Sequence, residues 1–191
     1  DIGGDLTNLA VFEEGYIRSI GILKLGGEKI TKDLAITLRI STEEAERAKK
    51  ILGTLRSDKE ETLEVMSLQD KKIRITTSQV REIIQPRVEE ILEFIAKKLE
   101  ELNSPLELIP GGIVLTGGTA LLDGLVDFTS GYLNIPVRLS YPPEMVNFLG
   151  TSDNEAVFYS CAVGALKRVT KDTNSEEKSR KFLDYLKETF N

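Results

Sequence analysis

Two glycine pairs beside apolar runs constrain the fold of this chain more than any other feature of its sequence. The first pair lies in Asp1-Ile2-Gly3-Gly4-Asp5-Leu6-Thr7-Asn8, and the second in Gly112-Ile113-Val114-Leu115-Thr116-Gly117-Gly118-Thr119. Glycine has no Cβ, so the backbone N–H groups of such loops can approach a phosphate or a sugar closely. Each pair alone also fits a simple turn after a strand. Their order and surroundings together indicate a nucleotide cleft.

Polar side chains beside the first loop can supply chemistry to that cleft. The carboxylate of Asp1 can hold Mg²⁺ through water, and the hydroxyl of Thr7 can bond a phosphate oxygen. Asp1 also fits a turn residue or a hairpin cap, and this alternative stays open. The sequence has no histidine. This absence removes Ser-His and Cys-His catalysis and the usual zinc sites.

The composition excludes some classes of partner. The chain has 191 residues, of which 40% are hydrophobic, so it can bury a core. A net charge of −6 and a pI near 5.0 argue against a nucleic-acid partner, because phosphate contacts need a clustered basic surface. No apolar run reaches the roughly 18–20 residues of a membrane span. Cys161 lies in an apolar stretch, so we expect a buried, reduced thiol in a cytoplasmic protein.

Hydrophobic periodicity predicts two hairpins, several helices and a final β-α-β-α arrangement. Ser41 and Glu44 fit a capping box at the start of one helix, with Gly53 after its end. Pro86 is expected to kink the longest helix or to mark a junction. The predicted strands span residues 9–12, 16–23, 63–68, 72–76, 113–116 (buried) and 137–140, and the predicted helices span 30–38, 42–52, 78–102, 121–133 and 154–167.

Several motifs resemble a known family. Asp1-Ile2-Gly3-Gly4-x-x-Thr7 resembles the second phosphate motif of the actin, Hsp70 and sugar-kinase superfamily. Ile113-Val114-Leu115-Thr116-Gly117-Gly118, with Ala120-Leu121-Leu122-x-Gly124-Leu125, resembles its adenosine motif. Leu25-Gly26-Gly27-Glu28-Lys29-Ile30 and Ile83-Ile84-x-Pro86-Arg87-Val88-Glu89-Glu90-Ile91 are similar to the family of the bacterial division protein FtsA. The resemblance covers residues 1 to about 169.

The resemblance implies an α/β fold, namely an actin-like ATPase (ribonuclease H-like) lobe with an inserted α+β subdomain. Subdomain 2A would comprise residues 1–25 and 108–169, and subdomain 2B residues 26–107. Residues 170–191 would form a linker and a C-terminal amphipathic helix. Asp1 stands where a strand would be ending, so we expect the chain to be the second half of a longer actin-like body.

ATP and Mg²⁺ are the implied cofactors, with at most weak ATPase activity in the intact protein and none in the isolated fragment. Asp5 and Thr119 stand where actin-like proteins usually carry a third glycine. Asp5 adds negative charge near the phosphates, and Thr119 restricts a loop expected to need positive φ. The implied nucleotide-binding residues are Asp1 (also the metal residue), Gly3, Gly4, Thr7, Gly26, Gly27, Glu28, Lys29, Gly117, Gly118 and Leu122.

The resemblance also implies a division adaptor that polymerises and recruits the tubulin-like protein FtsZ by binding its C-terminal tail with subdomain 2B. Basic side chains would face carboxylates of that tail. The alternative is that these side chains lie on solvated helix faces, paired with glutamates such as Glu46 and Glu90. The candidates are Arg47, Lys49, Lys50, Arg81 and Arg87.

The last residues predict an amphipathic helix. Phe182, Leu183, Leu186 and Phe190 share one face, as in the membrane-binding helix that ends FtsA chains. This implies a cytoplasmic protein bound peripherally to the inner face of the cytoplasmic membrane. The alternative is a helix that packs back on the body of the protein.

Two other functions fit the same superfamily. Thr7-Asn8-Leu9 favours the actin-like cytoplasmic protein of type IV pilus assembly, which would bind a short peptide of a membrane partner, whereas the 83–91 segment argues against it. A sugar or acetate kinase is the third possibility. It lacks support because no constellation of substrate-binding acids stands outside the cleft.

Overall fold

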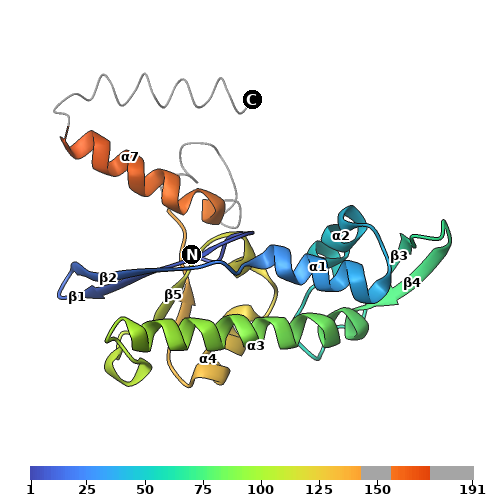
Figure 1. Ribbon diagram of the computed structural model, residues 1–191, viewed down its shortest axis with the longest axis horizontal. Coiled ribbons are helices and arrows are strands. Elements are labelled where there is room, and N and C mark those ends of the chain that lie inside the picture. Colours follow the sequence, from blue (N-terminus) through green and yellow to red (C-terminus); the bar gives the residue numbers. More distant parts are fainter. Residues whose placement is uncertain (143–155, 173–191) are drawn as a thin grey trace. The chain divides into compact units, whose positions relative to one another are not determined.

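The computed structural model describes residues 1–142 and 156–172, which belong to two units, Asp1–Leu139 and Ser140–Asn191. In the second unit, a 3-10 helix over Val157–Tyr159 leads into α7 (Ser160–Asp172). The first unit contains, in chain order, β1 (Thr7–Glu13), β2 (Tyr16–Leu23), α1 (Gly27–Leu38), α2 (Thr42–Leu52), β3 (Thr62–Met66), β4 (Lys72–Thr76), α3 (Thr77–Glu101), β5 (Ile113–Leu115), α4 (Leu125–Leu133) and β6 (Val137–Leu139), with 3-10 helices over Leu106–Leu108 and Gly118–Leu121 (Figure 1).

Within residues 1–142 and 156–172, the strands pair as three two-stranded sheets. β1 and β2, and likewise β3 and β4, are antiparallel neighbours, which confirms both predicted hairpins. Glu14 and Gly15 connect the first pair and both have positive φ, the geometry that two-residue hairpin turns prefer. β5 and β6 pair in parallel, as strands joined by a helix do.

α3 is the element around which the first unit is built. It contacts α1, β2 and α4, and it lies along α1 in Figure 1. Thr76 and Gln79 form a capping box at its start, which the sequence reading had missed. The buried stripe that holds it consists of Thr77, Val80, Ile84, Val88, Ile91, Leu92, Ile95 and Leu99.

Pro86 does not divide this helix. α3 runs from Thr77 to Glu101 with Pro86 inside it, so the expectation of a junction was wrong. A proline removes one helical N–H donor. Buried side chains before and after Pro86 hold both halves of α3 against the same core, which offsets that local loss.

The capping residues predicted α2 correctly, whereas the helix predicted after the second glycine pair starts later than expected. α2 has the predicted bounds, and Ser41 Oγ accepts from the Glu44 N–H at 3.2 Å. The reciprocal half of the predicted box is replaced, because the Glu44 carboxylate accepts from Arg47. The helix predicted over 121–133 starts at Leu125, after Gly124 in the left-handed region.

Two predictions of burial were wrong. Val114 in β5 is 44% exposed, because β5 is a short strand whose middle residue points away from the core. Cys161 is exposed, because it lies on α7 beside other exposed residues and only Val163 nearby turns inward. The apolar composition of a segment therefore did not identify its buried face.

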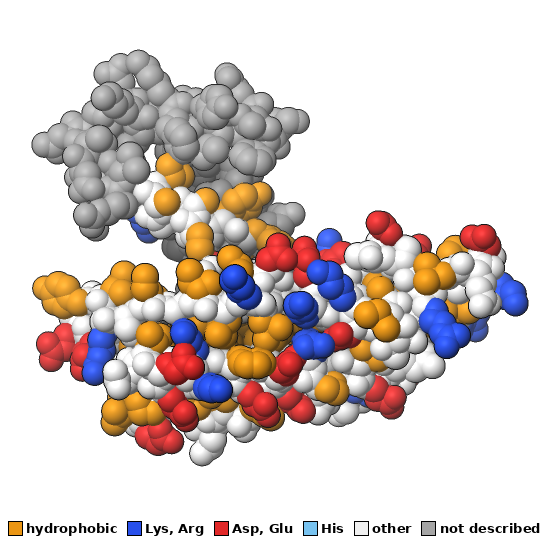
Figure 2. Space-filling view, in the orientation of Figure 1, with side chains coloured by type: hydrophobic (Ala, Val, Ile, Leu, Met, Phe, Trp, Pro, Cys, Tyr) orange, Lys and Arg blue, Asp and Glu red, His pale blue; other side chains and the backbone are white. Residues whose placement is uncertain are grey.

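Exposed apolar side chains gather on the hairpin of β1 and β2. One of its faces packs on the core through partly buried Leu9, Val11 and Leu23. On the view in Figure 2, acidic and basic side chains are interspersed beyond this hairpin. The exposed set on the hairpin is Phe12, Tyr16, Ile17, Ile20 and Ile22.

Some expectations lie outside the described residues. The predicted amphipathic helix with Phe182, Leu183, Leu186 and Phe190 falls in residues 173–191. Across residues 1–142 and 156–172, no helix has the length and apolar character needed to cross a membrane.

Replacing Ile84 with alanine should destabilise the chain by about 2–5 kcal/mol, because its side chain is fully buried between α3 and its neighbours. Ile36→Ala is the matched control, since Ile36 is 76% exposed, and it should change the free energy of unfolding by less than about 0.5 kcal/mol. Urea unfolding followed by circular dichroism measures both. Equal losses for the two variants would contradict the packing described.

Candidate nucleotide site

The two glycine pairs lie beside each other, joined through the backbone of Ile2. The Ile2 N–H donates to Thr116 O at 2.8 Å, and the Thr119 N–H donates to Ile2 O at 3.0 Å. The side chain of Ile2 is buried in the core. The first loop is therefore bonded to both sides of the second one.

A third glycine pair, at the start of α1, completes the arrangement. The Gly27 N–H donates to Gly3 O, and the Glu28 N–H donates to Gly4 O, both at 2.9 Å. These two donors of the first helical turn are thus used by the first loop and cannot cradle a phosphate. Any phosphate contact must come from other groups of the three pairs.

Close backbone approach explains why glycine stands at these positions. A Cβ on Gly26 would lie 2.3 Å from Gly4 O, and a Cβ on Gly27 would lie 2.3 Å from Thr119 Oγ1. Real Cβ atoms essentially never come so close to other atoms. The α1 start can approach both loops only without side chains.

Asp1 lies against the second loop, as a residue of the same site would. A Cβ on Gly117 would be 2.5 Å from Asp1 Oδ1 and 2.7 Å from Ile2 O, and Gly117 has φ +90. The Asn8 N–H donates to Asp1 O at 2.9 Å. Among the described residues no group of three acidic, histidine or cysteine side chains could hold a metal.

Thr119 has a role that the sequence reading missed. Its hydroxyl donates to Gly3 O at 2.9 Å, so it ties the second loop to the first. It lies in a 3-10 helix and is not among the residues with positive φ. The expectation that a β-branched residue conflicts with this loop was wrong, because glycine conformation is needed at Gly117 instead. The sequence signal for this contact is a hydroxyl residue directly after the second glycine pair.

Thr7 is not placed as predicted. Its side chain is 1% exposed, and its hydroxyl donates to Leu25 O at 2.7 Å. The Thr7 hydroxyl, which was expected to bond a phosphate, thus holds the segment before α1 against β1. Its role in this structure is to support the site from within the core.

A polar network supports the first turn of α1 from α2. Lys49 Nζ donates to Thr31 Oγ1 at 2.8 Å and to Gly27 O at 3.3 Å, and it pairs with Glu46 at 2.6 Å. Thr31 in turn donates to Glu46 at 2.6 Å. Partial burial would raise the pKa of Glu46, but the hydrogen bonds from Lys49 and Thr31 outweigh it and hold that pKa below 4.5. Lys49 thus positions Gly27 from within the chain.

The other predicted partner-binding side chains also have contacts within the chain. Arg47 donates to Glu44 and to Glu64 O, and Arg81 donates to Arg56 O. Arg87 forms a two-point contact with Asp33 at 2.6 and 3.1 Å and a further one with Glu90. Lys50 lies 3.7 Å from Glu46 and is 73% exposed. Pairing with Glu46 and Glu90, the alternative left open above, therefore occurs, and of the five Lys50 offers the most exposed cation.

Of the remaining predicted residues, Gly118 belongs to the second loop, whereas Glu28, Lys29 and Leu122 lie at the margins of the site. Glu28 and Lys29 are in the first turn of α1, where Glu28 pairs with Lys32 at 3.4 Å. Gly118 begins the 3-10 helix, and Leu122 follows its end, 3.0 Å from where a Cβ on Gly53 would lie. The structure thus brings Asp1, Gly3, Gly4, Gly26, Gly27, Gly117 and Gly118 together.

Comparison with solved structures defines the class of protein. MreB5 of Spiroplasma citri bound to AMPPNP aligns with TM-score 0.69 at 21% identity, over 90% of this chain and 53% of that one. A PilM-PilN type IV pilus biogenesis complex aligns at 0.63 and 18%, over 86% and 43%. A MamK double helical filament aligns at 0.60 and 18%, over 83% and 51%. The chain has an actin-like ATPase fold, which confirms the predicted fold class.

Sequence comparison then gives the family. The family described as Cell division protein FtsA matches residues 1–164. The FtsA of Bacillus subtilis is 39% identical over 171 residues, covering 87% of this chain and 37% of that protein. The FtsA of Neisseria meningitidis is 36% identical, covering 90% and 42%. This chain belongs to the FtsA cell division protein family, and it spans well under half the length of these relatives.

Gly117→Ala should destabilise the chain by about 1–3 kcal/mol, because alanine is strained at φ +90 and its Cβ would meet Asp1 and Ile2 O. Gly111→Ala is the matched control, with nothing within 4 Å of the added Cβ. Thermal unfolding compares them. An unchanged midpoint for Gly117→Ala would rule out the loop contact described here.

Acid should weaken the network at Glu46. A carboxyl with a lowered folded-state pKa stabilises the fold fully above its unfolded pKa, near 4.5, and loses this contribution as pH falls through the folded-state value. Glu46→Gln should therefore lose less stability than the parent chain between pH 7 and about pH 3. Urea midpoints at both pH values test this, with Glu82→Gln on the exposed face of α3 as the control. Parallel acid losses in parent and Glu46→Gln would refute it.

Proposed function

We propose that this chain supplies one lobe of an ATP-binding, actin-like division protein that self-associates into filaments. The convergence of three glycine pairs around Ile2, in a chain of the FtsA family, carries this proposal. Gly3, Gly4, Gly117 and Gly118 would line the nucleotide, and Asp1 would hold Mg²⁺ through water. An AMPPNP-bound MreB5 and a filament of MamK, both of this fold, support nucleotide binding and self-association.

ATP would control assembly and would not be hydrolysed for turnover. Asn8 stands where an acid is common in the superfamily, and Thr7, the neighbouring hydroxyl, is used within the core. Neither residue therefore offers a base for activating water. The phosphates would be bound and oriented, with little assistance to their transfer.

Residues 26–107 would act as subdomain 2B and bind the C-terminal tail of FtsZ. These residues form α1, α2, the β3–β4 hairpin and α3, and they include the exposed cation of Lys50. An ammonium at the rim of a peptide site would steer an acidic tail toward it. The basic side chains with contacts inside the chain, such as Arg87 with Asp33, would support the peptide site instead of contacting the tail.

Membrane attachment would come from residues 170–191, through Phe182, Leu183, Leu186 and Phe190. These side chains recur at helical spacing, and lysines and arginines stand among them. The protein would then lie at the inner face of the cytoplasmic membrane and bring FtsZ to it.

The runner-up is an actin-like pilus-assembly protein that binds a short peptide of a membrane partner. The likeness to the PilM-PilN complex favours it, although at 18% identity that likeness concerns the fold alone. The two proposals differ in the peptide that binds the chain, which makes them separable in one assay.

Fluorescence anisotropy of a labelled FtsZ C-terminal peptide should show saturable micromolar binding to the 191-residue chain, once circular dichroism has confirmed folding. Lys50→Glu should weaken binding roughly tenfold, because an exposed attraction becomes a repulsion. Lys24→Glu, an exposed charge reversal outside residues 26–107, should leave it unchanged. A folded chain that binds no FtsZ peptide would favour the pilus protein.

A further inference from the structure

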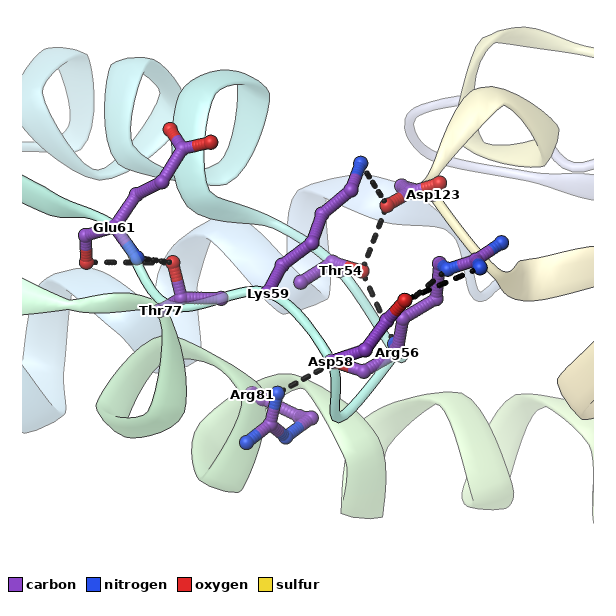
Figure 3. Close-up of polar contacts among 8 residues, drawn as sticks. All are labelled: Thr54, Arg56, Asp58, Lys59, Glu61, Thr77, Arg81 and Asp123. Carbon is purple, nitrogen blue, oxygen red and sulfur yellow. Dashed lines mark hydrogen bonds and ion pairs between the residues drawn. The ribbon is translucent and has the colours of Figure 1, made fainter.

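A second cluster of polar contacts lies just beyond the second glycine loop, where residues 53–61 cross the turn at Asp123 and Gly124 (Figure 3). The Thr54 hydroxyl donates to Asp123 Oδ2 at 2.9 Å, and Lys59 Nζ donates to the same oxygen at 2.9 Å. The hydrogen bond from Lys59 lowers the pKa of Asp123 below its ordinary value, so the carboxylate stays charged. One carboxylate thus receives two donors from one segment.

The backbone adds to this contact. The Leu55 N–H donates to Asp123 O at 2.9 Å, and Thr54 and Asp123 form a parallel bridge. Gly124 has φ +78, and a Cβ there would lie 2.9 Å from Arg56 Cγ. The turn is therefore shaped to let the segment approach it closely.

The same segment is held to α3 on its other side. Arg81 Nη1 donates to Arg56 O at 2.5 Å (Figure 3). The Thr77 N–H donates to Glu61 O, and the Glu61 N–H donates to Thr77 Oγ1, both at 3.0 Å. Asp123 is thereby connected through residues 54–61 to the start of α3.

Asp123 is also close in sequence to the nucleotide loop. Thr119 is bonded to Ile2 O and Gly3 O, and three residues separate it from Asp123. The intervening residues form a short helical turn, closed by the Leu122 N–H donating to Thr119 O. A displacement of Asp123 would therefore be transmitted to the second glycine loop over a single turn.

The contact combines a buried and an exposed part. Thr54 is 4% exposed, so its hydroxyl would lose its acceptor in a place that water reaches poorly if Asp123 moved away. The side chains of Lys59 and Asp123 are 52% and 40% exposed, so their ion pair alone is weak. The buried hydrogen bond from Thr54 therefore contributes most to holding Asp123 in place, and the exposed ion pair with Lys59 contributes less.

We propose that the contacts of Thr54 and Lys59 with Asp123 position the second glycine loop. They would thereby couple the predicted subdomain 2B, residues 26–107, to the nucleotide site. The positioning concerns contacts within the chain, whereas the coupling rests on the proposed binding of ATP. A nucleotide that requires the loop in its present place would then favour the closed contact. A partner that moves residues 53–61 would then change the affinity for the nucleotide. By linkage, the nucleotide would change the affinity for that partner by the same factor.

Hydrogen exchange of the 191-residue chain tests the positioning. Asp123→Ala and Thr54→Val should each speed exchange of the amides in residues 118–123 roughly tenfold, without affecting the β1–β2 hairpin. Their effects should be less than additive in the double variant, because both remove the hydrogen bond between Thr54 and Asp123. Asp58→Ala, which removes the pair with Arg56 and leaves both hydrogen bonds to Asp123 in place, is the matched control and should leave residues 118–123 unchanged.

Unchanged exchange in residues 118–123, or equally faster exchange throughout the chain, would overturn the positioning role. If Asp123→Ala does not fold, Lys59→Met removes only the exposed partner and should give a smaller acceleration in the same residues. No acceleration in Lys59→Met would then overturn it.

The coupling is tested by adding Mg-ATP to the same samples. ATP should slow exchange in residues 117–122 of the parent chain, and Asp123→Ala should need several-fold more ATP for the same protection. Equal ATP dependence in the two chains would overturn the coupling. No effect of ATP on a folded parent chain would instead overturn the proposed nucleotide role, while the exchange data without ATP still decide the positioning.

Discussion

The backbone of Ile2 is the point on which the rest of the site depends. Its side chain belongs to the core, whereas its N–H and C=O are bonded to Thr116 and Thr119. Two segments far apart in sequence are thereby fixed at hydrogen-bond distance. At that distance no Cβ fits on Gly117, and the start of α1 can join them only through Gly26 and Gly27. The glycine pattern thus follows from the separation that Ile2 imposes.

α3 provides the common support for both ends of the first unit. Its buried stripe packs on α1 and β4 as well as on β2 and α4. Arg87 adds a two-point contact to Asp33 on α1, and this hydrogen bonding raises the pKa of Arg87. Because one long helix packs on α1 and β4 as well as on β2 and α4, a change at one of these contacts has a rigid element through which to reach the others.

Local rules predicted the elements well. The two hairpins, the Ser41 cap and the long helix predicted over 78–102 each depend on residues close in sequence, and all were found. At the candidate site, the errors concern partners that are distant in sequence. Thr7 finds Leu25 O, and Lys49 finds Gly27 O, which no spacing in the sequence could indicate. The order and surroundings of the first two glycine pairs indicated a shared cleft, whereas Gly26 and Gly27 were assigned to it only through the family resemblance.

Because of Thr119, the second glycine loop has less conformational freedom than a loop made of glycine alone. Its hydroxyl gains a hydrogen bond to Gly3 O, and its β-branched side chain narrows the conformations open to the loop. A loop stiffened in this way adapts poorly to a ligand by changing its own shape. The remaining freedom is movement of the whole turn relative to α1, and the attachment of that turn at Asp123 limits this movement. Control of nucleotide binding would therefore lie in the contacts of residues 53–61 more than in the loop itself.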